Sequence, residues 1–250
     1  EEDDLQTGLS WKQRVRRMCL NGSLLLIPDE TGDRKMFMWE YPVEFIKSFD
    51  EIIVLTYLME GSVFEKYLKF YNIPYVIEKG IQLPDNPFDL INVIDSENMN
   101  RVGNRDGAFS ATHCRGLKKD HRVSVQVKKN LQNYFLNSTY GKSGINDRLW
   151  TTVKDSQPIF KGRGYSRRFI PCNTKAVNNY SSTYQIAYVY NPHLSPDIYN
   201  HLARRGEEYA PDNDRFMLSE MLQLIYRSRI RKGEQINLYV PSLRCRDALE

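Results

Sequence analysis

Four polar residues near the C-terminus have the types and the spacing to contact a phosphate group. Gln223, Arg227 and Arg231 recur every four residues, and Arg229 lies between the two arginines. On a helix, this spacing places the first three residues in one stripe opposite the apolar residues of the same stretch. A guanidinium presents several N–H donors in a fixed geometry that suits phosphate oxygens. The stripe therefore predicts a phosphate contact, and the alternative interpretation is a helix with a solvated basic face.

Arg229 does not fit this stripe. It falls on the apolar side of the helix that we expect over residues 218–229, so either the helix ends before it or its side chain is buried with a partner. Gly233 follows, and the apolar residues 236–240 predict a closing strand. The arginines are therefore expected where the last helix gives way to the last strand.

A second polar group consists of Asn173, Lys175 and Asn178. It lies between a short strand expected at 168–171 and a clear strand expected at 185–190. Small polar side chains and free backbone amides on such a loop suit a sugar–phosphate backbone. Four basic residues precede the loop within 161–168, which favours a polyanionic partner. The alternative interpretation is a turn-rich loop without a ligand.

The stretch from 218 to 241 resembles the last motif of superfamily-two helicases, and it is still more similar to the C-termini of phage-encoded members of that group. The resemblance implies a motor of two RecA-like domains that hydrolyses ATP while it moves along DNA or unwinds it. In that family, the arginines reach across the cleft between the domains toward the γ-phosphate. Arg227 and Arg231 would then be catalytic, and Gln223 and Arg229 would contact the nucleotide. The spacing departs from the common helicase pattern, whose final arginine falls at the position of Ile230.

Three further stretches are similar to helicase motifs. Residues 169–190 resemble the motif that precedes the arginines, and residues 150–154 resemble a segment whose role is either nucleic-acid contact or packing. Residues 50–57 resemble the strand that links ATP binding to nucleic-acid contact, although a plain core strand is the simpler interpretation. The nucleic-acid-binding residues that the resemblance implies are Thr56, Trp150, Thr151, Asn173, Lys175 and Asn178.

A complete ATP site is not expected within this chain. Gly141, Lys142 and Ser143 end like a P-loop, but Leu136 stands where the first glycine belongs, and the stretch follows a helix rather than a strand. We therefore expect ATP and Mg²⁺ to be held mainly by residues outside this chain. The chain would be a fragment of a helicase and would not hydrolyse ATP alone. The four cysteines are scattered without a CxxC pair, so no metal site is predicted.

The order of elements predicts an α/β fold. Strands are expected at 24–27, 36–39, 51–57, 75–77 and 149–153, besides the three near 168–171, 185–190 and 236–240. Helices are expected at 10–20, 42–49, 62–70, 118–135 and 196–203, besides the last one. Residues 84–116 lack periodicity. The resemblance adds that residues 1–100 are the C-terminal part of a first RecA-like domain and residues 101–250 are the second, each a parallel sheet with flanking helices.

Composition constrains the partners only weakly. The 250 residues carry a net charge of +4, but basic residues cluster near positions 12–17, 118–129, 161–168 and 227–231. This distribution favours a nucleic-acid partner, which the resemblance specifies as DNA, expected to be single-stranded, with replication proteins as further expected partners. No apolar run reaches membrane-spanning length, so no membrane partner is predicted. Isolated cysteines suit a reducing cytoplasm, here that of a bacterial host if the protein is phage-encoded.

A competing interpretation keeps the resemblance but drops the catalysis. Without a P-loop, the chain could be a non-catalytic, helicase-like module that binds nucleic acid or regulates a partner. A P-loop directly upstream in the parent gene would favour the motor, and a start codon just before Glu1 would favour the module. A structural interaction domain with basic faces is the third possibility.

Overall fold

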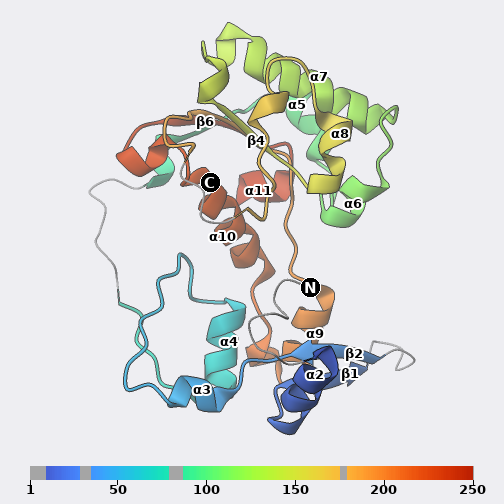
Figure 1. Ribbon diagram of the computed structural model, residues 1–250. Coiled ribbons are helices and arrows are strands. Elements are labelled where there is room, and N and C mark those ends of the chain that lie inside the picture. The colour runs from blue at the N-terminus through green and yellow to red at the C-terminus, as the bar shows by residue number, and fades with distance from the viewer. Residues whose placement is uncertain (1–9, 29–34, 79–86, 175–178, 250) are drawn as a thin grey trace. The chain divides into compact units, whose positions relative to one another are not determined.

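The computed structural model describes residues 10–28, 35–78, 87–174 and 179–249, and the chain divides into two compact units (Figure 1). The smaller one, called the small unit, comprises residues 1–56, 63–75 and 195–210. The larger one, called the sheet unit, comprises residues 57–62, 76–194 and 211–250.

The sheet unit is built on four parallel strands. These are β3 (Ile91–Val93), β4 (Arg148–Thr151), β5 (Gln185–Tyr188) and β6 (Ile236–Tyr239), in the spatial order β3-β6-β5-β4. Because all four run the same way, their first residues share one edge of the sheet and their last residues share the other. We call these the amino edge and the carboxyl edge. The arrangement confirms the expected α/β fold with a parallel sheet flanked by helices.

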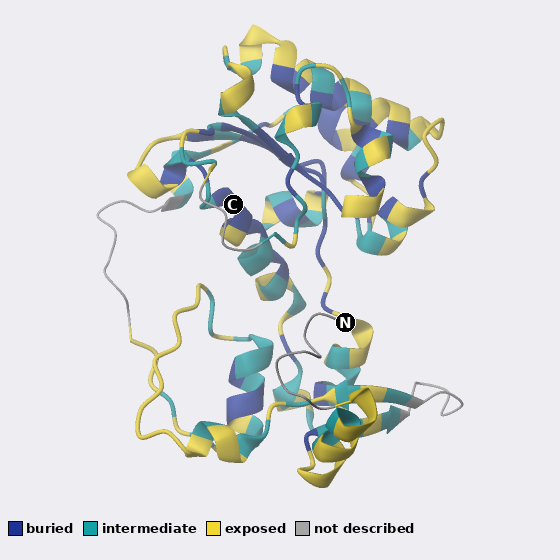
Figure 2. Ribbon diagram, in the orientation of Figure 1, coloured by how far each residue is buried: buried dark blue, intermediate teal, exposed yellow. Residues whose placement is uncertain are grey.

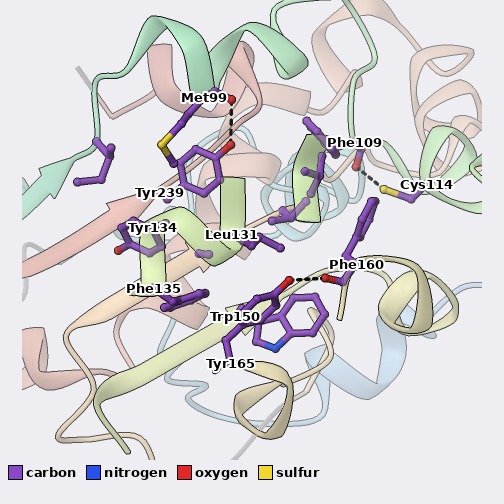
Figure 3. Close-up of a cluster of buried hydrophobic side chains, with 14 of the residues drawn as sticks. Met99, Phe109, Cys114, Leu131, Tyr134, Phe135, Trp150, Phe160, Tyr165 and Tyr239 are labelled. Carbon is purple, nitrogen blue, oxygen red and sulfur yellow. Dashed lines mark hydrogen bonds between the residues drawn. The ribbon is translucent and has the colours of Figure 1, made fainter. Parts of the chain in front are cut away.

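Helices cover both faces of this sheet. Neighbouring strand residues point to opposite faces, so Trp150 packs beneath α7 (Arg122–Leu136), while Leu149 packs beneath α10 (Asn213–Ile225). The strands β4, β5 and β6 are almost entirely buried, as Figure 2 shows, whereas β3 at the edge of the sheet is only partly buried. Figure 3 shows the core under α7, where the buried Tyr239 hydroxyl donates to the Met99 carbonyl at 3.0 Å.

Short helices lie between these elements or follow the last strand. They are α5 (Glu97–Asn100), α6 (Ala111–Gly116), α8 (Gln157–Phe160) and α11 (Leu243–Asp247). Residues 168–171 do not form a regular strand, because only Phe169 bridges to Trp150 of β4. The strand β3 was not expected, because it lies in the aperiodic region; it pairs with β6.

The small unit contains α2 (Trp11–Leu20), β1 (Leu24–Pro28), β2 (Lys35–Trp39), α3 (Val43–Lys47), α4 (Val63–Phe70) and α9 (Pro196–Ala203). All six were expected. The Ser10 side chain caps α2 by accepting from the Gln13 amide, and β1 and β2 form an antiparallel pair. Glu40 accepts two hydrogen bonds from Arg205, at 2.6 and 2.9 Å, and so ties the end of the hairpin to the segment after α9.

Two expected strands are wrong. Residues 51–57 and 75–77 carry no regular strand, and Leu55 is 94% exposed. Their β-branched side chains favour extended backbone, but no described strand pairs with them. The parallel sheet expected from residues 51–57 and 75–77 is therefore not formed by the described residues. The expected boundary near residue 100 falls inside the sheet unit, whereas the division into two RecA-like domains stays a prediction.

Candidate functional site

The arginines lie on a turn after the helix, not on the helix itself. The helix α10 begins at Asn213 and ends at Ile225, so the helix expected over 218–229 begins five residues too late and ends four residues too late. The buried hydroxyl of Ser228 donates to the Ile225 carbonyl at 2.6 Å, and the Arg229 amide turns to the Thr183 carbonyl at 3.0 Å. These bonds replace the next helical turn. We call residues 227–232 the arginine segment. Its last four residues, Arg229–Lys232, form a 3-10 helix that is capped by Gly233 (φ 74°).

Arg229 is held by the protein itself. Its Nε donates to the Gln235 carbonyl at 2.5 Å, and its guanidinium lies 4.3 Å from the centre of the Tyr184 ring. The Glu234 carboxylate is 3.8 Å away. Because the helix ends before Arg229, this residue does not lie on the apolar side of a helix. Its contacts link the residues that directly precede β5 and β6. The expected nucleotide contact of Arg229 stays a prediction.

Arg227 is only partly satisfied by the protein. Its Nε donates to the Gln223 carbonyl at 3.3 Å, while its Nη1 is buried without a hydrogen-bond partner among the described residues. Burial lowers the pKa of Arg227, and nearby Glu220 only partly opposes this. A cation that is partly removed from water and lacks a close counter-ion gains most from an incoming anion.

Gln223 and Arg231 are exposed on either side of Arg227. The Gln223 side chain donates to the Ser219 hydroxyl at 3.3 Å and is accessible from solvent. Arg231 lies in the 3-10 helix. The three residues that were expected in one stripe of a helix therefore lie on three successive segments. Gln223 is on α10, Arg227 is on the turn after it, and Arg231 is on the 3-10 helix.

The end of the loop that precedes β5 lies at the same edge of the sheet. Residues 227–232 lead into β6 and residues 179–184 lead into β5, so both stand at the amino edge. Asn173 does not lie there. Residues 169–170 run parallel to β4 and lead toward the carboxyl edge, where Asn173 is exposed in a turn closed by the Thr174 amide, which donates to the Pro171 carbonyl at 3.0 Å. Lys175 and Asn178 lie outside the described residues. The guanidinium of Arg168 lies 5.0 Å from the Tyr180 ring, which adds a further cation beside the loop.

The other expected nucleic-acid contacts lie elsewhere. Trp150 and Thr151 are fully buried, and the Thr151 hydroxyl donates to the Ile170 carbonyl at 2.7 Å. Trp150 meets Tyr165 edge-on in the core of Figure 3, with ring centres 5.3 Å apart. This burial favours packing over nucleic-acid contact for the 150–154 segment. Thr56 is exposed on an irregular segment as the last residue before the chain passes from the small unit to the sheet unit, and its nucleic-acid contact stays a prediction.

The segment that resembles the end of a P-loop is tied to the sheet by its carbonyl groups. The carbonyls of Tyr140 and Lys142 accept from Asn237 and Tyr184, at 3.0 and 2.7 Å. The segment connects α7 to β4, whereas a P-loop leads from a strand into a helix. The geometry therefore agrees with the expectation that these residues are not a phosphate cradle.

A pocket at the carboxyl edge was missed by sequence reasoning. Its volume is about 610 Å³, and it lies among the loops that follow β3, β5 and β6, where open α/β sheets commonly bind ligands. Arg244 binds the Asn191 side chain at 2.8 Å and Asp214 at 2.7 Å, while Arg246 binds Asn104 at 2.9 Å. The paired arginines directly after β6 were the available signal. The pocket and the arginine segment lie at opposite edges of the sheet, so one small ligand cannot touch both.

Two features are absent from the described residues. No group of three or more His, Cys, Asp or Glu residues there is arranged to hold a metal ion. None of the helices in those ranges has the length and apolar character to span a membrane.

Comparison with known proteins places the sheet unit in a family. Residues 86–250 match the family described as "YonV C-terminal Rossmann-like domain". The chain is also 30% identical over 254 residues to the SPbeta prophage-derived uncharacterized protein YonV of Bacillus subtilis (strain 168). The alignment covers 95% of this chain and 59% of that relative. No solved structure matches the chain significantly.

Proposed function

The chain belongs to the family of the YonV C-terminal Rossmann-like domain, and we propose that it is the C-terminal part of an ATP-dependent nucleic-acid motor. In this proposal, the arginine segment supplies positive charge to the γ-phosphate of ATP, and the loop before β5 contacts the nucleic-acid backbone. The relative is derived from a prophage, which agrees with the resemblance to phage-encoded helicases.

The observation that carries the proposal is the environment of Arg227. Its Nη1 is buried without a described partner, on a turn at the amino edge, next to exposed Gln223. A purely solvated basic face would leave its guanidinium nitrogens in water, and a structural arginine would have partners as Arg229 does. A phosphoryl group brought to this edge would complete the set of contacts. The positive charge would stabilise negative charge that develops on the transferring phosphoryl group.

The remaining ATP-binding residues belong outside this chain in the proposal. The chain spans 59% of the length of its relative, and no P-loop occurs in its sequence. A P-loop and the groups that hold Mg²⁺ would come from another part of the whole protein. The pocket at the carboxyl edge has no role in this step, because it lies at the other edge of the sheet.

The test is ATP turnover by the whole protein in the presence of single-stranded DNA. Arg227→Ala is expected to lower kcat by about 10³–10⁵-fold, as removal of an arginine from a transferring phosphoryl group does, and Arg231→Ala to lower it substantially. Arg115→Ala is the control, because Arg115 is an exposed arginine of α6. Near-normal turnover in both Arg227→Ala and Arg231→Ala would contradict the assignment.

The absence of a P-loop in this sequence also supports a second candidate, a non-catalytic module that binds nucleic acid or regulates a partner. The same measurement separates the two. Nucleic-acid binding by the whole protein without any ATP turnover would favour the module, whereas turnover sensitive to Arg227 favours the motor.

A further inference from the structure

The helix α2 presents a cationic face without any described counter-ion. Its ten residues include Lys12, Arg14, Arg16 and Arg17 and no acidic residue, and none of the ten is buried. Helical spacing places Lys12, Arg16 and Arg17 on one exposed side. No carboxylate of the described residues lies within ion-pair distance of these three cations. This side, with Gln13, is called the cationic face.

The opposite side of α2 is occupied by the protein. Arg14, Val15 and Met18 are half-buried, and the Met18 carbonyl accepts from the Ser23 amide at 3.0 Å, just before β1. A helix that lies in a membrane surface needs a free apolar face to insert. Here that face packs against the hairpin, which leaves the cationic face to act through charge. Charge of this kind attracts a polyanion such as a nucleic-acid backbone.

A row of exposed aromatic rings lies in the same unit. Trp39, Tyr41, Phe45 and Phe49 follow one another edge to face, with neighbouring ring centres 5.3, 5.1 and 5.1 Å apart. Each of the four residues is 43–54% exposed, so each ring keeps surface that a base could cover. Many proteins bind single-stranded nucleic acid through exposed aromatic rings next to basic residues, because every base has a face that can stack on a ring. Duplex DNA keeps its bases stacked inside and offers the row no comparable surface.

We propose that the small unit binds single-stranded nucleic acid, with the phosphates on the cationic face of α2 and bases on the aromatic row. The site rests on the nucleic-acid partner of the proposed function but lies outside the residues that match the family, since it spans residues 12–49. It would hold the strand independently of the arginine segment.

The first test is binding of a fluorescent oligothymidylate to the 250-residue chain, measured by anisotropy at several salt concentrations. The triple variant Lys12→Glu, Arg16→Glu, Arg17→Glu should bind at least about tenfold more weakly, with a salt slope smaller by about 2, since each neutralised single-strand phosphate contributes about 0.7. Lys118→Glu, Lys119→Glu, Arg122→Glu makes the same change in charge at exposed positions of the sheet unit. It should weaken binding less than about threefold. Equal losses in the two variants would overturn the site.

The second test uses fluorescence. The protein has three tryptophans, of which Trp11 is 67% exposed, Trp39 is 54% exposed and Trp150 is fully buried. In Trp11→Phe, a fluorescence change on binding therefore reports on Trp39. Base stacking predicts strong quenching by the oligothymidylate and little by a duplex. Binding without quenching would overturn the role of the aromatic row.

The third test uses Cys19, which is exposed one helical turn after Arg16. Burial raises the pKa of the Cys114 thiol to about 12 and that of Cys245 to about 11, so both should react slowly. Bound oligonucleotide should slow alkylation of Cys19 several-fold, and an unchanged rate would contradict binding on this face.

The outcomes separate the two proposals. If the α2 triple variant binds the oligonucleotide as tightly as the wild-type chain does, this inference is wrong, and the proposed function is unaffected. If the wild-type chain does not bind the oligonucleotide but binds anionic vesicles, the ligand of the cationic face is a lipid surface and not a nucleic acid. The assignment of the arginine segment is tested separately, by ATP turnover.

Discussion

At the scale of single residues, three arginines with similar spacing have three different environments. Arg229 is stacked on Tyr184 and bound to a carbonyl, Arg227 is partly desolvated, and Arg231 is exposed. Sequence spacing located the group but could not separate its members. The partners of Arg229 come from the start of β5 and from the turn before β6, and pairings of this kind leave no local pattern.

These environments predict different effects on stability. Arg229→Ala should lower the free energy of unfolding by about 1–2 kcal/mol, because it removes a charge-assisted hydrogen bond and a partly exposed cation–π contact. Arg231→Ala should change it by less than about 0.5 kcal/mol, as most exposed substitutions do. Urea denaturation of the two variants provides the measurement. If Arg231→Ala lowers the free energy of unfolding as much as Arg229→Ala does, the assignment of a structural role to Arg229 alone is wrong.

At the scale of elements, the sequence predicted most helices and the three longer strands of the parallel sheet. It failed where an element depends on a distant partner. Residues 51–57 have strong strand preferences, yet the described residues offer them no neighbouring strand. The three-residue strand β3 has a weak local signal and is defined by its pairing with β6, about 145 positions away, as in Ile91 opposite Ile236. The carboxyl-edge pocket was missed for the same reason.

The contact between the loops at the carboxyl edge leads to a prediction about Gly103. A Cβ at this position would lie 1.8 Å from the Pro241 carbonyl oxygen, so an alanine cannot enter without moving the backbone that follows β6. Gly103→Ala should therefore destabilise the protein by at least about 1–3 kcal/mol, the usual range for overpacking. Gly116→Ala is the matched control, because nothing lies within 4 Å of a Cβ there. Thermal melts in which the two variants unfold together would contradict the close approach.

At the scale of the whole molecule, the two units differ in how they are held together. The sheet unit has two hydrophobic cores with many side chains that are fully buried, one on each face of the sheet. In the small unit, the buried hydrophobic side chains among the described residues are Tyr67, Leu68 and Leu202, each 4–7% exposed. Polar contacts around Glu40 therefore carry a larger share of its stability, and the small unit should open more readily.

The acid sensitivity of the two units should differ accordingly. Burial acts to raise the pKa of Glu40, but hydrogen bonds from Arg205, Tyr71 and His201 outweigh it and hold the pKa below its usual value. A carboxyl with a lowered folded-state pKa stabilises the fold fully above its unfolded pKa of about 4.3, and this contribution is lost as the pH falls through the folded value. Hydrogen exchange, corrected for its intrinsic pH dependence, should show protection in α4 and α9 falling in that acid range while α7 and α10 stay protected. In Glu40→Gln, α4 and α9 should already exchange faster at neutral pH and change less on acidification. Equal losses in both units would show that Glu40 does not govern the acid response.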